Sequence, residues 1–244
     1  MKKKRVLITG ITSFTGFHLS AELCGKGFDV WGTSRASSVD HKIHTLDLQS
    51  VEAVSQVLNL VRPEIIIHMA GVSFVDNNDI SAMYGANIIG TRNLLSAVVN
   101  LKFPPELVVI PSSSNVYAPS VEQLNEESSL DPANDYAISK LAVEYMANLL
   151  SDRLNIIVTR PFNYTGLGQN SNFLVPKIIA HFQQRKKFIN LGNVDVTRDI
   201  SDVRTVSLIY RLLIEKNPAS GVYNICSGRP VSIRQILDTA SSVY

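Results

Sequence analysis

Tyr136 and Lys140 could together exchange a proton with a substrate oxygen. Residues four positions apart lie on the same face of a helix. The ammonium group of the lysine would stabilise a phenolate, so that a hydroxyl with an ordinary pKa of about 10 could titrate closer to neutrality. The same spacing also occurs by chance on surface helices. Whether the pair is catalytic therefore depends on the strands and helices that position it.

Short apolar runs alternate along the chain with stretches that have the periodicity of helices. Continuous apolar strands between helices predict a parallel sheet covered on both faces, the doubly wound α/β (Rossmann) fold. In that fold, ligands bind at the carboxyl ends of the strands. We expect strands at residues 6–9, 29–33, 65–69, 107–111 and 155–160. We expect helices at residues 16–25, 49–61, 81–100 and 135–152.

The composition of the sequence and the expected elements change after Arg160. A loop rich in Gly and Asn is expected at 162–172 and a helix at 173–185, and the sequence ends at Tyr244 within a helix expected from about Ser232. We therefore expect a dinucleotide-binding Rossmann domain over residues 1–160. Residues 161–244 should form mainly a smaller, C-terminally shortened substrate-binding region, with some segments returning to the Rossmann core.

Composition narrows the class of protein. The 244 residues are 45% hydrophobic, which is enough for a packed core, and the net charge of +2 gives no general attraction to nucleic acid. No apolar run is long enough to span a bilayer. Cys24 and Cys226 lack the spacing of a metal or redox pair, so we expect buried thiols in a reducing compartment. The five histidines do not have the spacing of metal ligands, so we expect no metal site. We expect the protein to be cytoplasmic.

The segment from Thr9 to Gly16 predicts a nucleotide-binding loop, because it follows a strand and opens a helix. Gly10 permits a tight turn and Gly16 allows close packing of helix on strand, while the helix N-terminus offers N–H groups to a pyrophosphate. Ser13 stands where the usual pattern has its middle glycine, and an ordinary glycine turn is the alternative. A nicotinamide held here would let the tyrosine–lysine pair oxidise an alcohol or reduce a ketone.

The second strand ends without the acidic residue that would bind the ribose 2′-hydroxyl of NAD. Ser34 and Arg35 stand there instead and could receive the 2′-phosphate of NADP. This favours NADP over NAD. A solvent-facing arginine is the alternative.

Further segments match a known pattern in the same order along the chain. They are Asp47-Leu48, His68-Met69-Ala70-Gly71, residues 87–95, residues 112–117, Arg160-Pro161-Phe162-Asn163 and residues 198–203. Together with Tyr136 and Lys140 they resemble the extended short-chain dehydrogenase/reductases, the NAD(P)-dependent nucleotide-sugar epimerase/dehydratase/reductase group. The resemblance runs from residue 6 to about residue 237.

The resemblance implies a role for each matched position. Ser113 would hydrogen-bond the substrate oxygen, Tyr136 would be the acid/base, and Lys140 would tune it. Asn163 and Arg198 would bind the sugar and its diphosphate, with Lys177 adding charge unless it is simply a solvated helix lysine. The cofactor-binding residues would be Gly10, Thr12, Ser13, Phe14, Thr15, Gly16, Ser34, Arg35, Asp47, Leu48, Met69, Ala70, Gly71, Asn87, Tyr136, Lys140 and Pro161. Asp199 and Asp202 are expected at a helix N-terminus rather than as ligands.

The residues after Ser113 bear on the reaction. Dehydratases of this family carry an acidic residue there, whereas this chain has Ser114 and Asn115, which argues against dehydration. An NADP preference suits a net reductant, and residues 160–169 and 221–228 look most like those of family members that reduce GDP-4-keto-6-deoxy-D-mannose. We expect NADP(H)-dependent reduction of a GDP-linked 4-keto-6-deoxy sugar in deoxysugar biosynthesis. An NAD-dependent nucleotide-sugar 4-epimerase and a non-catalytic nucleotide-binding member remain alternatives.

The two long expected helices bear on assembly. Residues 81–100 and 135–152 carry apolar side chains on more than one face. The resemblance implies that these helices pair across a two-fold axis in a homodimer. The alternative is that both only pack on the sheet.

Overall fold

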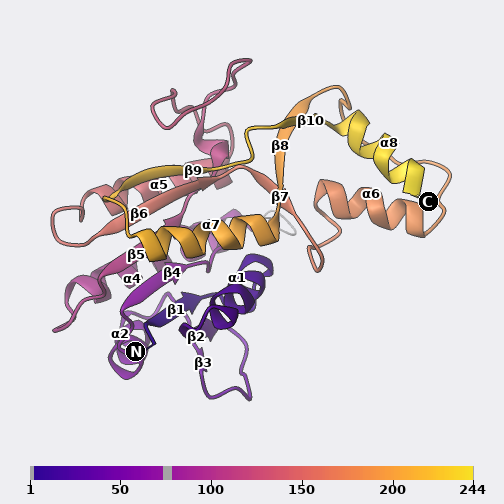
Figure 1. Cartoon of the computed structure of the whole chain (residues 1–244). Helices are drawn as coiled ribbons and strands as arrows, with labels where there is room; N and C mark the ends of the chain where they lie inside the picture. The colour runs from indigo at the N-terminus through magenta and orange to yellow at the C-terminus, as the bar shows by residue number, and fades with distance from the viewer. Residues whose placement is uncertain (1–2, 74–78, 244) are drawn as a thin grey trace.

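A seven-stranded parallel sheet forms the body of the protein (Figure 1), and the computed structural model describes residues 3–73 and 79–243. The last residue of the sequence, Tyr244, lies outside this part. The strand order is β3-β2-β1-β4-β5-β6-β9. The strands are β1 (Arg5–Thr9), β2 (Asp29–Ser34), β3 (Ile43–Thr45), β4 (Ile65–His68), β5 (Leu107–Pro111), β6 (Ile156–Pro161) and β9 (Gly221–Ile225). The predicted Rossmann-type architecture is confirmed.

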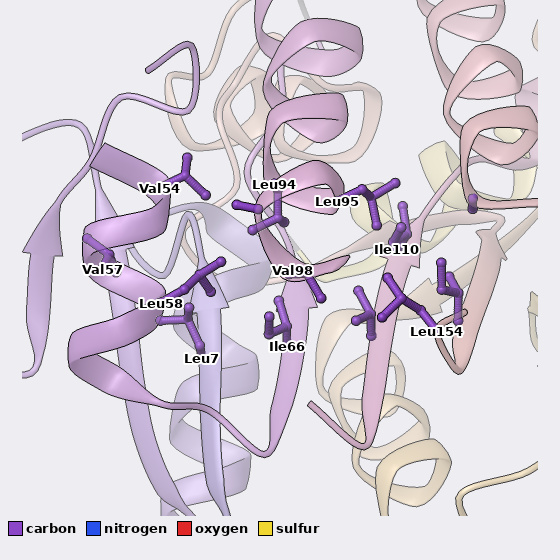
Figure 2. Close-up of a cluster of buried hydrophobic side chains, with 14 of the residues drawn as sticks. Leu7, Val54, Val57, Leu58, Ile66, Leu94, Leu95, Val98, Ile110 and Leu154 are labelled. Atoms are coloured by element: carbon purple, nitrogen blue, oxygen red, sulfur yellow. The ribbon is translucent and has the colours of Figure 1, made fainter. Parts of the chain in front are cut away.

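Alternate residues of the strands enter two cores, one on each face of the sheet. Leu7 of β1 and Ile66 of β4 face helices α2 (Val51–Val61) and α4 (Gly90–Val99), as Figure 2 shows. Their neighbours along the strands pack instead under α1 (Phe14–Gly25) and α7 (Val203–Lys216). Because both faces are buried, the strands read as continuous apolar runs rather than as alternating ones.

Side-chain caps set where several helices begin. Ser13 caps α1 by accepting a hydrogen bond from the Gly16 N–H, and Asn134 caps α5 (Asp135–Asn148). Asp202 caps α7, as predicted. The prediction for Asp199 is wrong, because it lies within a strand and its carboxylate accepts hydrogen bonds from the backbone N–H groups of residues 227–229.

The helix expected over 81–100 is interrupted. It consists of α3 (Ile80–Tyr84), a π-helical turn η2 (Gly85–Ile89) and α4 (Gly90–Val99). The side chain of Asn87 in η2 bonds both backbone groups of Val72. Single π-turns inside helices often mark functional sites. Here the turn brings a polar side chain to the loop after β4.

A smaller three-stranded sheet, β10-β8-β7, stands beyond the carboxyl end of β6. It contains β7 (Asn163–Thr165), β8 (Thr197–Asp202) and β10 (Pro230–Ser232), with helices α6 (Leu174–Gln183) and α8 (Ile233–Val243) beside it in Figure 1. Residues 162–172 were expected to be a loop, so β7 corrects that expectation. Its three residues form a strand by pairing with β8, which a local pattern does not reveal.

The cysteine expectation also needs correction. Cys24 and Cys226 are both free and exposed rather than buried. Cys24 lies on the solvent side of α1, and Cys226 follows β9. Within the described part of the chain, no helix combines the length and the apolar character needed to cross a membrane.

Candidate active site

Two neighbouring cavities open at the carboxyl ends of the central strands. The first, of about 330 Å³, lies over β5 and β6 and contains Ser113, Tyr136 and Lys140 in its wall. The second, of about 290 Å³, lies over β1 and β2. Ser13, Met69, Gly71 and Val72 line both. The cavities therefore meet at the crevice between β1 and β4, where the order of the strands reverses and where this fold binds ligands.

The loop between β1 and α1 is shaped by its glycines. Gly10 has a φ of +68°, and a Cβ there would stand 2.8 Å from the backbone of Ala70. At Gly16, a Cβ would stand 2.4 Å from the carbonyl oxygen of Gly10. Only glycine fits either position without a shift of the loop. The resulting close turn before the N-terminus of α1 fits the pyrophosphate of a dinucleotide.

The second cavity brings together the residues predicted to hold the adenosine part of the cofactor. Thr12, Ser34, Arg35, Asp47 and Leu48 all line it. Thr12 donates a hydrogen bond of 3.2 Å to Ser34, which is buried, whereas Arg35 is exposed. A cation at the rim beside a buried hydroxyl could bind a phosphate.

The first cavity brings together the three predicted catalytic residues. The Ser113 hydroxyl, from the end of β5, is hydrogen-bonded to the Tyr136 phenol on α5. The Lys140 ammonium lies 5.9 Å from the centre of the Tyr136 ring and donates a hydrogen bond of 2.9 Å to the carbonyl oxygen of Pro111. A carbonyl group of a substrate beside Ser113 and Tyr136 would meet two hydroxyl donors.

The acid–base balance differs from the expectation drawn from sequence. Burial, reinforced by Tyr164, raises the pKa of Tyr136, and the hydrogen bond with Ser113 offsets this only in part. Burial also lowers the pKa of Lys140 to about 8. Removal from water disfavours the charged form of both groups. The phenol is therefore held protonated at neutral pH, which is the form of a proton donor.

Asn87 lies behind the site rather than in its wall. Its amide group donates to the carbonyl oxygen of Val72 and to Ser139, and its side-chain oxygen accepts from the Val72 N–H. Since Ser139 lies on the same helix as Tyr136 and Lys140, Asn87 links the loop after β4 to α5. Asn87 therefore contacts the loop that carries the predicted cofactor-binding residues Met69, Ala70 and Gly71.

His68 is buried under the same loop, between Thr9 and Thr91. Burial, together with the charge of Lys140, lowers its pKa to about 3. The neutral, doubly hydrogen-bonded imidazole therefore links Thr9 to Thr91.

The structure separates the residues predicted on the substrate side. Pro161 and Asn163 line the first cavity. Lys177 and Arg198 line neither cavity; Lys177 donates to the Asn190 carbonyl oxygen and Arg198 to that of Thr197. Their assignment to the substrate phosphates thus remains a prediction. Gly16 also lies outside both walls, beneath the loop that it shapes.

Sequence reasoning missed Tyr164, which lines the first cavity. Its hydroxyl lies 2.9 Å from that of Thr15, and its ring stacks on Phe14 at 6.2 Å between centroids. These contacts tie β7 to the first turn of α1. Tyr164 directly follows Asn163 in β7, and both residues line the cavity. Phe162, Gln169 and Phe173 line the same wall.

The wall of the first cavity carries no carboxylate among the described residues. Its polar side chains are hydroxyls, amides, His68 and Lys140.

Known proteins place these features in context. Residues 6–226 match the model of the family described as "NAD dependent epimerase/dehydratase family". A GDP-6-deoxy-D-talose 4-dehydrogenase of Aggregatibacter actinomycetemcomitans is 37% identical over 95% of this chain and 77% of its own length. A GDP-6-deoxy-D-mannose reductase of Pseudomonas aeruginosa is 30% identical over 98% of this chain and 80% of its own length.

Solved structures agree with the fold. A Burkholderia cenocepacia protein superposes with a TM-score of 0.91 and is 41% identical, covering 98% of this chain and 80% of its own. A structure described as RMD from Pseudomonas aeruginosa complexed with NADPH has a TM-score of 0.85 and 30% identity, with coverage of 99% and 81%. Together with the family description, this supports a nicotinamide cofactor for this chain.

Replacement of Gly10 by alanine is expected to weaken dinucleotide binding at least tenfold. The new methyl group would push the loop away from Ala70 and spoil the approach to the pyrophosphate. Isothermal titration with NADPH and NADH measures the effect. Gly25→Ala is the matched control, because a Cβ there meets nothing within 4 Å. Equal affinities in both variants and the wild type would show that the dinucleotide does not bind at this loop.

Proposed function

This chain belongs to the NAD dependent epimerase/dehydratase family, and from that premise we propose that it reduces a nucleotide-linked 4-keto-6-deoxy sugar with NADPH. The observation that carries the proposal is the Ser113–Tyr136–Lys140 group in a cavity wall that has no carboxylate among the described residues. A GDP-linked substrate is favoured because two relatives that are at least 30% identical over nearly the whole chain are named for GDP-6-deoxy sugars.

The residues have distinct parts in the proposed reduction. A bound reduced nicotinamide supplies the hydride for the C4 carbonyl carbon of the sugar. Tyr136 donates its proton to the carbonyl oxygen, and Ser113 donates a hydrogen bond to the same oxygen. Lys140 stabilises the phenolate left on Tyr136 until a proton from solvent restores the phenol. The protonated phenol produced by burial suits this direction of reaction.

The domain division and the cellular location that we propose rest on the sequence. We assign residues 1–160 to the dinucleotide-binding domain and 161–244 mainly to the substrate side, with β9 returning to the large sheet. We also place the protein in the cytoplasm. Localisation of a fluorescent fusion at the membrane or outside the cell would contradict that placement.

Replacement of Tyr136 by phenylalanine is expected to lower kcat by at least about 100-fold, since the proton donor is lost. The assay follows NADPH absorbance with GDP-4-keto-6-deoxy-D-mannose as substrate, and NMR of the product gives the configuration at C4. Tyr223→Phe is the control, because that hydroxyl bonds the Ala219 carbonyl oxygen and does not line either cavity.

Wild-type activity that survives in Tyr136→Phe would refute the assigned role. If the wild type oxidises no NADPH but interconverts nucleotide sugars at C4 with bound NAD, the protein is an epimerase. If it binds dinucleotide and turns over neither substrate class, it is a non-catalytic member of the fold.

Replacement of Arg35 by alanine is expected to raise KM for NADPH by about 10- to 100-fold and to leave KM for NADH nearly unchanged. This follows from losing a charge-assisted contact with the 2′-phosphate, worth roughly 1.5–3 kcal/mol. Steady-state kinetics with both cofactors measure the ratio. Arg153→Ala removes another exposed arginine away from both cavities and serves as control. An equal effect on both cofactors would refute a role in NADP selection.

A homodimer through residues 81–100 and 135–152 is the assembly that we propose. Ile138 and Tyr145 of α5 and Leu149 directly after its end are exposed and recur at helical spacing, and Ile89 is exposed in η2. Leu149→Glu is expected to produce a monomer in light scattering, because the charge would be buried in the interface. Leu208→Glu on α7 is the control. A monomeric wild type would refute the dimer.

A further inference from the structure

A buried ion pair joins Arg160, at the end of β6, to Glu144 on α5. Arg160 Nε lies 3.0 Å from Glu144 Oε1, and Arg160 Nη2 lies 2.7 Å from Glu144 Oε2. The side chains are only 5% and 8% exposed. This bidentate contact between the planar guanidinium and the carboxylate fixes the orientation of β6 relative to α5.

Both side chains of this pair also make hydrogen bonds to other residues. The Ser112 hydroxyl donates to Glu144 Oε1. Arg160 Nη1 donates to the Tyr117 hydroxyl at 3.0 Å and to the Glu126 carbonyl oxygen at 3.1 Å. Burial alone lowers the pKa of Arg160, but the hydrogen bonds to Glu144 and Tyr117 outweigh it and raise the pKa. The guanidinium is therefore permanently charged, and it donates four hydrogen bonds in this network.

The network meets the catalytic group from two sides. Ser112 directly precedes Ser113, and Glu144 follows Lys140 by one helical turn on α5. The Lys140 ammonium bonds the Pro111 carbonyl oxygen, which lies next to Ser112. Ser113 and Tyr136 come from different elements, and their hydrogen bond depends on how α5 sits against the end of β5.

We propose that Glu144 and Arg160 are positioning residues that hold α5 against the ends of β5 and β6, so that Ser113 and Tyr136 reach the same substrate oxygen. This inference rests on the proposed reductase function for its kinetic readout. Neither residue lines the cavities, so both act through Ser112 and the helix rather than on the substrate.

Stability alone does not require such a pair. Burying two charges is costly, and replacing a buried ion pair by neutral residues of similar volume is often neutral or stabilising. Removing only one partner leaves an unpaired buried charge and destabilises the protein strongly. A double replacement therefore separates the geometric role of the pair from its contribution to stability.

The test compares Glu144→Gln, Arg160→Met and the double variant with the wild type. The double variant leaves no unpaired charge, since Glu144→Gln removes the anion but keeps an acceptor for Ser112, and Arg160→Met removes the cation. Thermal unfolding should return close to the wild-type midpoint in the double variant. Its kcat should stay about 10- to 100-fold low, with both KM values within about threefold, because misplacing catalytic groups by about 1 Å costs this much.

The control makes the same kinds of change around Arg211, which pairs with Glu215 on α7 and with Glu22 on α1. It combines Arg211→Met with Glu215→Gln and Glu22→Gln, so that no unpaired charge is left. That control should keep wild-type kcat. If kcat recovers together with stability in the Glu144/Arg160 double variant, the pair is only structural and the proposal is overturned. If the double variant does not fold, Arg160→Lys decides. Lysine keeps the positive charge but cannot make the bidentate contact with Glu144, so kcat should fall at least about threefold with KM unchanged. A wild-type kcat would overturn the proposal.

A crystal structure of the double variant gives a readout that does not depend on the reaction. The proposal requires that Ser113 Oγ and Tyr136 Oη move out of hydrogen-bond range. If the wild type reduces no keto sugar, the proposed function fails. The Ser113–Tyr136 separation still decides the positioning role, because an unchanged hydrogen bond overturns it.

Discussion

The parallel register of β1, β4, β5 and β6 is the constraint on which the rest of the structure depends. Parallel strands all end at one edge of the sheet, so each strand delivers the residues after its last hydrogen bond to the same place. Thr9 pairs with His68, and Pro111 pairs with Thr159, next to Arg160. A slip of one residue would turn the apolar set of a strand to the other core and would also move its terminal polar residue. The two cores thus fix the candidate active site as well as the fold.

Much of this arrangement was predictable from sequence because it follows from local patterns. The buried strands are continuous apolar runs, and Gly10 and Gly16 mark a turn that no other residue fits. Short elements were not predictable: β3 and β7 have three residues each, and pairing with a neighbouring strand creates them. The π-turn around Asn87 was equally hidden, because its sequence continues the periodicity of the helix on either side.

The sequence predicted which residues would meet in the cavity wall, but not the environment that surrounds them. Ser113, Tyr136 and Lys140 were chosen from spacing and resemblance, and the structure brings them into one cavity wall. The sign of the pKa shift at Tyr136 was wrong, since the sequence shows a nearby lysine but not how much water burial removes. Glu144 was missed for a similar reason. A glutamate in a helix usually faces solvent, and only the fold reveals that an arginine 16 residues later reaches it in the interior.

The Aggregatibacter and Pseudomonas relatives are named for opposite directions of hydride exchange, a dehydrogenase and a reductase of GDP-6-deoxy sugars. One apparatus can serve both, because a group that donates a proton in reduction must accept it in oxidation. The direction then depends on cofactor supply, and the configuration at C4 depends on which face of the carbonyl meets the nicotinamide. In the proposed mechanism Ser113 and Tyr136 would bind the oxygen in either case, so they would not select the face. That choice falls to the side chains that hold the rest of the sugar, and β7 places Asn163 and Tyr164 in the cavity wall, where they could do so. The difference between a talose and a mannose product would therefore lie in the substrate-side wall, outside the catalytic group that the sequence motifs identify.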